Sequence, residues 1–200
     1  MSTMTPLEAF CAAVEAGDDG RAETLALTMT ATDEATLLEM AGSSSIDERW
    51  WAIRALAVCG SEQTIPVLQA ALVDEDASVR GAAALATAYV YRRHAEAVAP
   101  LLSSVASLLA DDEGMVRQCA ADSLAHCGNA AVPVLERLLR ESDHQGARSR
   151  AAGALRKIAT ADAAMVLYRV LNDSNHIVRT YAYESLDELG LLENVLVTLQ

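Results

Sequence analysis

Arginine and apolar residues recur along the chain with a period of about thirty residues. The arginine returns at intervals of 31, 37, 31 and 31 residues, at Arg49, Arg80, Arg117, Arg148 and Arg179. An alanine follows each arginine three residues later, and a small or apolar residue follows it ten residues later. A fixed period of this length is typical of a solenoid, in which a short helical unit packs against copies of itself.

Each period predicts two helices. Positions −1, +3, +7 and +10 relative to the arginine are mostly apolar, which is the spacing of one buried face of a helix. Another apolar segment with a leucine pair precedes this B helix, and short polar residues such as Asp74, Asp111 and Asp173 fill the turn between the two. The predicted A/B pairs are 33–41/46–59, 62–73/77–91, 95–110/113–127, 130–140/146–159 and 162–172/176–189.

The two ends of the chain depart from the pattern. Residues 5–30 predict a degenerate helical pair (5–16 and 20–30), the five repeats span 33–190, and residues 191–200 predict a C-terminal capping segment. The 37-residue interval places six extra residues around Tyr91–Val98, and Pro100 predicts a kink or a late helix start. Gly60, Gly128 and Gly190 are expected to end B helices in the usual glycine position. We therefore expect one all-α domain over 1–200, with about five to six helical hairpins.

Composition limits the classes of function. Hydrophobic residues make up 52% of the chain and aromatic residues 4%, so the core depends on Ala, Leu and Val. The net charge of −13, from 28 acidic and 15 basic residues, disfavours nucleic acids and anionic membranes and favours partners with basic patches. The sequence contains no apolar run of membrane-spanning length and no secretory signal, so we expect a soluble, cytoplasmic protein.

Cysteine usage indicates packing rather than chemistry. Cys59 and Cys127 occupy the same position of two repeats, where the other repeats carry Val, Ile and Leu. This substitution pattern predicts small hydrophobic side chains with reduced thiols, and no C-x-x-C spacing points to a disulfide or a metal.

The Asp turn followed by V-R-x-x-A-x-x-A-L, clearest at Asp112–Leu124 and Asp173–Leu186, resembles HEAT repeats. The unit length is most similar to the short HEAT-like repeats of phycobilisome lyase (PBS lyase) subunits. The resemblance covers roughly residues 33–190 and departs from the pattern at Glu48, Thr87 and Ala147. It implies a right-handed α-solenoid (an α-α superhelix), with A helices outside and B helices lining a concave face. It implies binding more firmly than any reaction.

In such repeats the turn aspartate and the B-helix arginine commonly pair between neighbours. The resemblance therefore implies that the repeat arginines are partly buried structural ions that hold one repeat in register with the next. The structural positions are Arg49, Arg80, Arg117, Arg148, Arg179, Asp74, Asp111 and Asp173.

The variable positions of the B helices are expected to face the concave side, and aromatic residues and arginine are the usual interface anchors. The candidate protein-binding residues are Trp50, Trp51, Arg54, Tyr89, Arg150, Arg156, Lys157 and Tyr181. Two alternatives stay open. One tryptophan could cover the core beneath the N-terminal pair. The three cations of the fourth repeat could form a solvated surface neutralised by Glu184, Asp187 and Glu188, or a small anion site.

Candidate catalytic and cofactor chemistry is sparse. His144 and His176 lie in turns one repeat apart, but they are interpreted as polar turn residues rather than metal ligands. The sequence contains no nucleophile elbow and no phosphate-binding glycine loop. The His-Glu dipeptides of HEAT-like di-iron hydroxylases do not occur. We expect no catalytic residues, no metal and no cofactor.

These observations predict a non-catalytic scaffold or adaptor that binds another protein through the concave face. The alternative is a lyase-like or chaperone subunit that assists attachment of a tetrapyrrole or another prosthetic group to an acceptor protein. A HEAT-like DNA glycosylase, which reads DNA through a basic face, is disfavoured by the charge.

Overall fold

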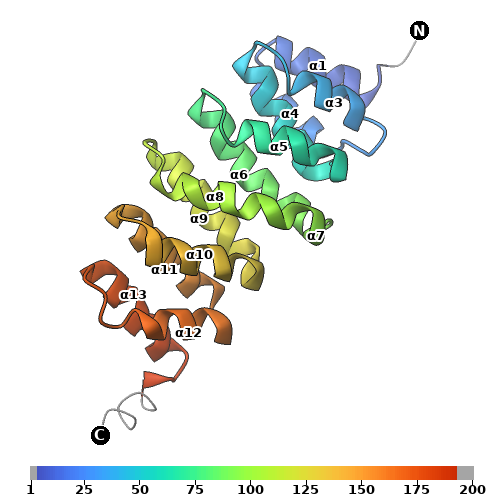
Figure 1. Cartoon of the computed structure of the whole chain (residues 1–200). Coiled ribbons are helices and arrows are strands. Elements are labelled where there is room, and N and C mark those ends of the chain that lie inside the picture. Colours follow the sequence, from blue (N-terminus) through green and yellow to red (C-terminus); the bar gives the residue numbers. More distant parts are fainter. Residues whose placement is uncertain (1–3, 193–200) are drawn as a thin grey trace, which may run out of the picture. The chain divides into compact units, whose positions relative to one another are not determined.

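Two-helix repeats account for the secondary structure of the computed structural model, which describes residues 4–192 (Figure 1). The chain divides into unit 1, Met1–Leu101, and unit 2, Leu102–Gln200. Unit 1 contains α1 (Pro6–Glu15), α2 (Asp19–Ala26), α3 (Glu34–Met40), α4 (Ile46–Cys59), the 3₁₀ turn η1 (Glu62–Thr64), α5 (Ile65–Ala71), α6 (Ala77–Tyr91), α7 (Ala95–Val98) and η2 (Ala99–Leu101). Unit 2 contains α8 (Leu102–Ser107), η3 (Leu108–Ala110), α9 (Gly114–His126), η4 (Gly128–Ala131), α10 (Val132–Glu141), α11 (Gln145–Ile158), α12 (Ala161–Arg169) and α13 (His176–Glu188).

The predicted all-α fold of stacked helical hairpins is confirmed within each unit. The five predicted A/B pairs and the N-terminal pair all occur, with helix ends within a few residues of the predicted positions. The predicted capping segment 191–200 falls almost entirely outside the described residues, and a single domain over 1–200 stays a prediction. None of the helices in the described part is long and apolar enough to cross a membrane.

Local sequence signals explain where the helices begin. The side chains of Ser45, Asp76 and Asn175 each accept a hydrogen bond from a backbone amide in the first turn of α4, α6 and α13. Thr5 and Glu8 form a capping box at the start of α1. The turn residues therefore satisfy the free amides that a helix start leaves unpaired.

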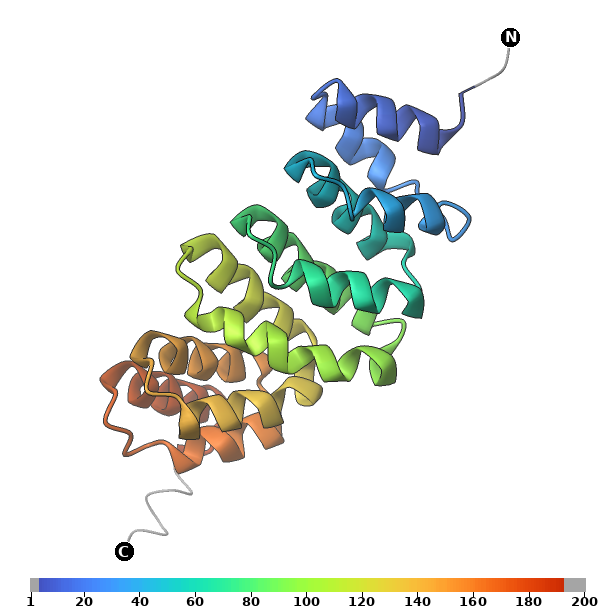
Figure 2. The ribbon, with the colours of Figure 1, turned by 45° about the horizontal axis from the view of Figure 1, so that its top comes forward.

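Hairpin stacking is visible within each unit (Figures 1 and 2). In unit 1, α4 packs against α6, and α1 and α2 cover the other side of α4. In unit 2, the B helices α9, α11 and α13 are successive neighbours, and α10 packs against both α8 and α12. Each hairpin therefore buries its apolar face against the next one.

Small residues allow this close stacking. The alanines three residues after each repeat arginine are all 0% exposed. The residues six positions after the arginine are small and also buried, and they are Ala55, Ala86, Ser123, Ala154 and Ser185. Both positions lack the bulk that would hold neighbouring helices apart, which confirms the second contact line predicted from the sequence.

The repeat arginine holds the turn of its own hairpin. Arg80 donates to the carbonyl oxygens of Asp74 (2.9 Å) and Glu75 (3.1 Å), which lie six and five residues before it. The same pair of backbone contacts recurs at Arg49, Arg117 and Arg179. A guanidinium group presents several donors in a rigid plane, so one side chain satisfies two carbonyl groups of the turn.

The arginine also reaches the aspartate of the next turn. Arg49 donates through Nε and Nη2 to the two carboxylate oxygens of Asp74, both at 2.9 Å, and Arg148 pairs with Asp173. These two pairs confirm the implied contact between neighbouring repeats. Arg117 departs from it, because Ser142 occupies the corresponding position and no ion pair to Arg117 occurs among the described residues.

Two features of the backbone bear on the sequence predictions: the break at Pro100 and the conformation of the glycines that end B helices. The A helix of the third repeat is interrupted at Pro100 by η2, which confirms the predicted break. Gly128 and Gly190 adopt the expected left-handed conformation, with φ of +59° and +67°, but Gly60 does not. A Cβ at Gly60 would lie 2.5 Å from the Leu56 carbonyl oxygen, so close packing rather than a left-handed turn requires this glycine.

Replacing Asp74 with asparagine is expected to destabilise unit 1. Burial would raise the pKa of the Asp74 carboxyl, but hydrogen bonds from Arg49 and the Asp76 amide outweigh burial and hold the pKa below its usual value. We expect Asp74→Asn to lower the free energy of unfolding by about 2 kcal/mol at pH 7, measured by urea unfolding.

The sign of the pH dependence follows from the lowered pKa in the folded state. The ionised carboxylate stabilises the fold above the pKa of an unfolded aspartate, about 3.9, and this contribution is lost as the pH falls through the folded value. The difference between wild type and Asp74→Asn should therefore shrink below about pH 4. Glu75→Gln is the matched control, because Glu75 is 88% exposed and lies 3.8 Å from Arg49. An equal loss of stability in both variants would contradict the role of Asp74.

A glycine at position 159 is expected to stabilise unit 2. Ala159 ends α11 in the left-handed conformation, with φ of +52°, where a Cβ is unfavourable. We expect Ala159→Gly to raise the free energy of unfolding by about 0.5–1 kcal/mol, and Gly128→Ala to lower it by a similar amount. Thermal unfolding followed by circular dichroism measures both changes, and a destabilised Ala159→Gly would contradict the strain at this position.

Candidate functional site

The eight predicted binding residues fall into two groups, one in each unit. Trp50, Trp51, Arg54 and Tyr89 belong to α4 and α6 of unit 1, and Arg150, Arg156, Lys157 and Tyr181 belong to α11 and α13 of unit 2. Each group lies beside a groove formed by three neighbouring helices of its own unit. The two grooves differ in polarity, and we describe them in turn.

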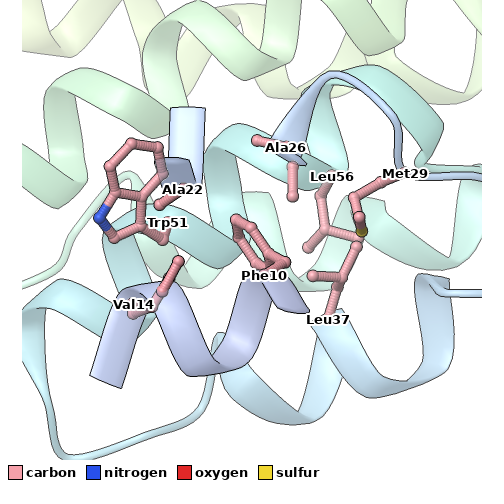
Figure 3. Close-up of a cluster of buried hydrophobic side chains, with 10 residues drawn as sticks. Phe10, Val14, Ala22, Ala26, Met29, Leu37, Trp51 and Leu56 are labelled. Atoms are coloured by element: carbon pink, nitrogen blue, oxygen red, sulfur yellow. The ribbon is translucent and has the colours of Figure 1, made fainter. Parts of the chain in front are cut away.

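Trp51 belongs to the core rather than to an accessible surface. Its side chain is 5% exposed and packs edge to face against Phe10, with ring centroids 6.3 Å apart (Figure 3). The N-terminal pair α1 and α2 supplies Phe10, Val14 and Ala22 to this cluster. The assignment of Trp51 as a contact residue is therefore corrected, and the alternative that one tryptophan covers the core beneath the N-terminal pair holds for it.

Trp50 is half-buried and connects this core to a charged group. Its ring packs edge to face on Trp51, with centroids 4.7 Å apart, and the Arg54 guanidinium lies 4.7 Å from the Trp50 ring centroid. Arg54 also pairs with Glu23 at 3.0 Å. The cation–π contact and the ion pair hold Arg54 in place at the edge of the groove.

The groove of unit 1, which we call the α2–α4–α6 groove, is mainly apolar. It has a volume of about 410 Å³ and is lined by Glu23, Ala26, Leu27, Arg54, Ala57, Val58, Ala82, Leu85, Ala86, Tyr89 and Arg93. Leu27 is 70% exposed and Tyr89 is 54% exposed, which is high for apolar side chains gathered in one groove. The structure therefore brings Arg54 and Tyr89 together at this groove, whereas neither tryptophan lines it.

Leu27, Val58 and Arg93 are among the residues of this groove that the sequence interpretation missed. Val58 occupies the variable position nine residues after Arg49, so the register of the repeat would have predicted its place beside the groove. Leu27 belongs to the degenerate N-terminal pair, which lies outside the register of the repeat arginines. Arg93 comes from the inserted residues and donates to the carbonyl oxygens of Ala57 (3.0 Å) and Gly60 (3.2 Å), at the C-terminal end of α4.

The groove of unit 2, which we call the α9–α11–α13 groove, is less apolar than the groove of unit 1 and carries three cations. It has a volume of about 500 Å³ and is lined by Gln118, Ala121, Arg150, Gly153, Ala154, Arg156, Lys157, Tyr181 and Glu188. All four predicted residues of unit 2 line it. Three positive side chains and one carboxylate gather here, although the chain as a whole has a net charge of −13.

Two of the three cations are neutralised by carboxylates. Arg156 pairs with Glu184 and Glu188, and its hydrogen bond and charge hold the pKa of Glu188 below the usual value. Lys157 pairs with Asp122 at 2.7 Å. For Arg156 the partners are two of the carboxylates named from the sequence, Glu184 and Glu188, whereas Lys157 pairs with a carboxylate of the preceding B helix rather than the following one.

Arg150 is the exception. Its one hydrogen bond in the described structure is from Nη1 to the Leu109 carbonyl oxygen, at a long 3.4 Å, and no carboxylate of the described residues pairs with it. Burial and the like charge of Arg117 lower the pKa of Arg150 from its ordinary value. Arg150 is thus a half-buried cation, and the charged residue that lowers its pKa, Arg117, is also positive.

His144, Cys59 and Cys127 have structural roles. His144 caps α11, because its Nδ1 accepts from the Ala147 amide at 3.0 Å. No group of three or more His, Cys, Asp and Glu residues in the described range converges on a possible metal position. Burial raises the pKa of the Cys127 thiol to about 12, and burial with the nearby carboxylates of Glu34 and Asp33 raises that of Cys59 to about 11. Both thiols are therefore protonated at neutral pH.

Comparison with known proteins agrees with this architecture. The pattern that describes HEAT repeats matches residues 34–107 and 102–187. No curated protein sequence matches the chain.

Two solved structures with a similar fold are engineered proteins. A crystal structure of an engineered protein, Northeast Structural Genomics Consortium target OR329, shares 21% identity over 92% of this chain and 96% of its own length, with a TM-score of 0.53. A second engineered protein, target OR497, shares 20% identity over 91% of this chain and 52% of its own, with a TM-score of 0.50. At these identities the similarity concerns the fold alone.

The two tryptophans are expected to differ in their effect on stability. Trp51→Ala removes a buried ring from the N-terminal core and should lower the free energy of unfolding by about 3–5 kcal/mol. Trp50→Ala removes a half-buried ring and should cost clearly less. Urea unfolding followed by circular dichroism measures both variants without relying on tryptophan fluorescence. Equal losses for the two variants would contradict the placement of Trp51 in the core.

Proposed function

This chain belongs to the HEAT-repeat family, and on that premise we propose that it is a non-catalytic scaffold that binds another protein. The observation that carries the proposal is the α2–α4–α6 groove, where exposed Leu27, Val58 and Tyr89 line one depression. Apolar side chains gathered in a groove with a polar rim are typical of a protein-binding surface.

The chemistry of the groove indicates the kind of partner. Leu27, Val58 and Leu85 come from three different helices, so the groove fits a segment that inserts apolar side chains between them. Arg54 and Glu23 at the edge already pair with each other, which leaves the apolar floor as the main source of binding energy. Outside the groove, the acidic chain favours a partner with basic patches.

Rigid display is the mechanism that we propose for this scaffold. The lining residues are carried mainly by helices whose alanine and leucine faces are buried, and Arg54 is held by Trp50 and Glu23. Little side-chain and backbone freedom is therefore lost when a partner binds. No step of this mechanism needs a catalytic residue, a metal or a cofactor.

A comparison of two double variants tests the proposal. Leu27→Ala/Tyr89→Ala removes the most exposed apolar side chains of the groove. Val73→Ala/Met165→Ala removes side chains that are 77% and 54% exposed but do not line the groove. Proteins retained by the wild-type chain are identified, purified and titrated against both variants by calorimetry. We expect the groove variant to bind at least about tenfold more weakly, because groove anchors each contribute on the order of 1–2 kcal/mol, and the control to bind as the wild type does.

Circular dichroism must first show that both double variants are folded. Equal affinity of the groove variant and the control for every purified partner would remove the α2–α4–α6 groove from the binding site. The same wild-type sample tests the lyase-like alternative, because a bound bilin or haem would shift its absorbance on binding. Such a shift, lost in the groove variant, would replace the scaffold role with the handling of a prosthetic group.

A further inference from the structure

We propose that unit 2 carries a second, independent binding site, in which Arg150 of the α9–α11–α13 groove binds a single carboxylate side chain on an otherwise neutral peptide segment. The site does not rest on the α2–α4–α6 groove, because the two sites share no residue. Four features of the sequence and structure lead to this inference.

The first feature is the position of Arg150 in the repeat. Two residues after the repeat arginine, the other repeats carry uncharged residues that are buried or half-buried: Trp51, Ala82, Cys119 and Tyr181. Only the fourth repeat places a charge at this position. A guanidinium group at a position otherwise occupied by uncharged side chains loses hydration, so its presence needs a compensating interaction.

The second feature is that the described residues of unit 2 do not supply this interaction. The Leu109 carbonyl oxygen, 3.4 Å from Nη1, satisfies one of the five N–H donors of Arg150 weakly. Arg117, the neighbouring cation, donates to the Asp111 and Asp112 carbonyl oxygens at 2.7 Å but has Ser142 where other turns have aspartate. The Arg117 Nε is buried and makes no hydrogen bond. A carboxylate from outside would reduce the repulsion between these two guanidinium groups.

The third feature is the shape of the groove beside Arg150. Gly153 lies on the same helix, and a Cβ added to it would be 3.4 Å from the ring of Tyr181. The glycine therefore leaves space beside the Tyr181 ring, and both residues line the groove. The groove volume of about 500 Å³ accommodates a carboxylate side chain together with the backbone that carries it.

The fourth feature is the charge around the groove, which selects the ligand. Arg156 and Lys157 already pair with Glu184, Glu188 and Asp122. Arg150 is therefore the cation of this groove that is left to pair with a ligand. The rim carboxylates and the net charge of −13 would repel a polyanion such as a nucleic acid. An isolated carboxylate on a mostly neutral peptide avoids this repulsion and fits one bidentate guanidinium group.

A pair of blocked peptides tests the site. The acidic probe is an acetylated and amidated Gly-Tyr-Glu-Gly peptide, and the neutral probe replaces its glutamate with glutamine. Each is titrated into the isotope-labelled full-length chain, and NMR follows the Arg150 Nε–H and the backbone amides of Gly153 and Tyr181. We expect the acidic peptide to shift these signals in a saturable way and to bind at least about tenfold more tightly than the neutral peptide.

Three variants separate the site from a general charge effect. Arg150→Gln should weaken binding of the acidic peptide at least about tenfold, whereas Arg169→Gln, which removes a paired cation of unit 2 that does not line the groove, should change it less than threefold. Gly153→Leu fills the groove without changing any charge and should also abolish binding. The dispersion of the remaining amide signals reports whether each variant is folded.

Several outcomes would overturn the proposal. Equal weakening by Arg150→Gln and Arg169→Gln would show a diffuse charge effect rather than a site. Unchanged binding in folded Gly153→Leu would place the peptide elsewhere. Inorganic phosphate could displace the bound acidic peptide at a lower concentration than the peptide itself needs to bind. That result would assign the groove to a phosphate ligand instead. Loss of partner binding in the Leu27→Ala/Tyr89→Ala variant bears on the other groove and leaves this result unaffected.

Discussion

The contacts of the repeat arginine are the interaction on which the repeats depend. One guanidinium group joins the backbone carbonyls of its own turn to the carboxylate of the following turn, as Arg49 does with Ser43, Ser44 and Asp74. The fully buried alanine three residues later allows the neighbouring helices to approach closely enough for this contact. A planar group with five donors suits this task, whereas a lysine would satisfy fewer of the same acceptors at once. Position and spacing of each B helix are therefore set by polar contacts at the turn as well as by the apolar face.

The sequence predicted most of the fold because each repeat obeys the same local rules. The period fixed the B helices, and the small residues at +3 and +6 identified both buried lines correctly. Prediction was poorer where the packing involves segments outside the repeats, because there the arginine period does not indicate which side chains are buried. The burial of Trp51 depends on how Phe10 and the N-terminal pair pack, and no repeat position encodes that packing. Leu27 and Arg93 lie in the degenerate pair and in the insertion, so the groove that they line could not be assembled from the period alone.

The two grooves show how one repeat produces different chemistry. The position five residues after the arginine carries Arg54, Leu85, Asp122, Gly153 and Glu184 in successive repeats. None of these substitutions disturbs the buried alanines, because position +5 lies on another face of the helix. In unit 1, Leu85 lines an apolar groove that also holds the paired cation Arg54, and in unit 2, Gly153 lines a groove beside Arg150, which has no carboxylate partner among the described residues. The scaffold is thus conserved within the chain while its accessible surface changes from repeat to repeat.

Helix α11 contains two features that oppose its own stability. Gly153 stands in the middle of the helix, where glycine costs about 0.5–1 kcal/mol relative to alanine. Arg150 places a half-buried charge beside Arg117 without a carboxylate partner among the described residues. The remaining positions of the helix follow the repeat, including buried Ala151 and Leu155. Local departures from otherwise consistent rules are expected where a protein binds something. Because both departures line the same groove, a single ligand that pairs with Arg150 and packs over Gly153 would account for them together.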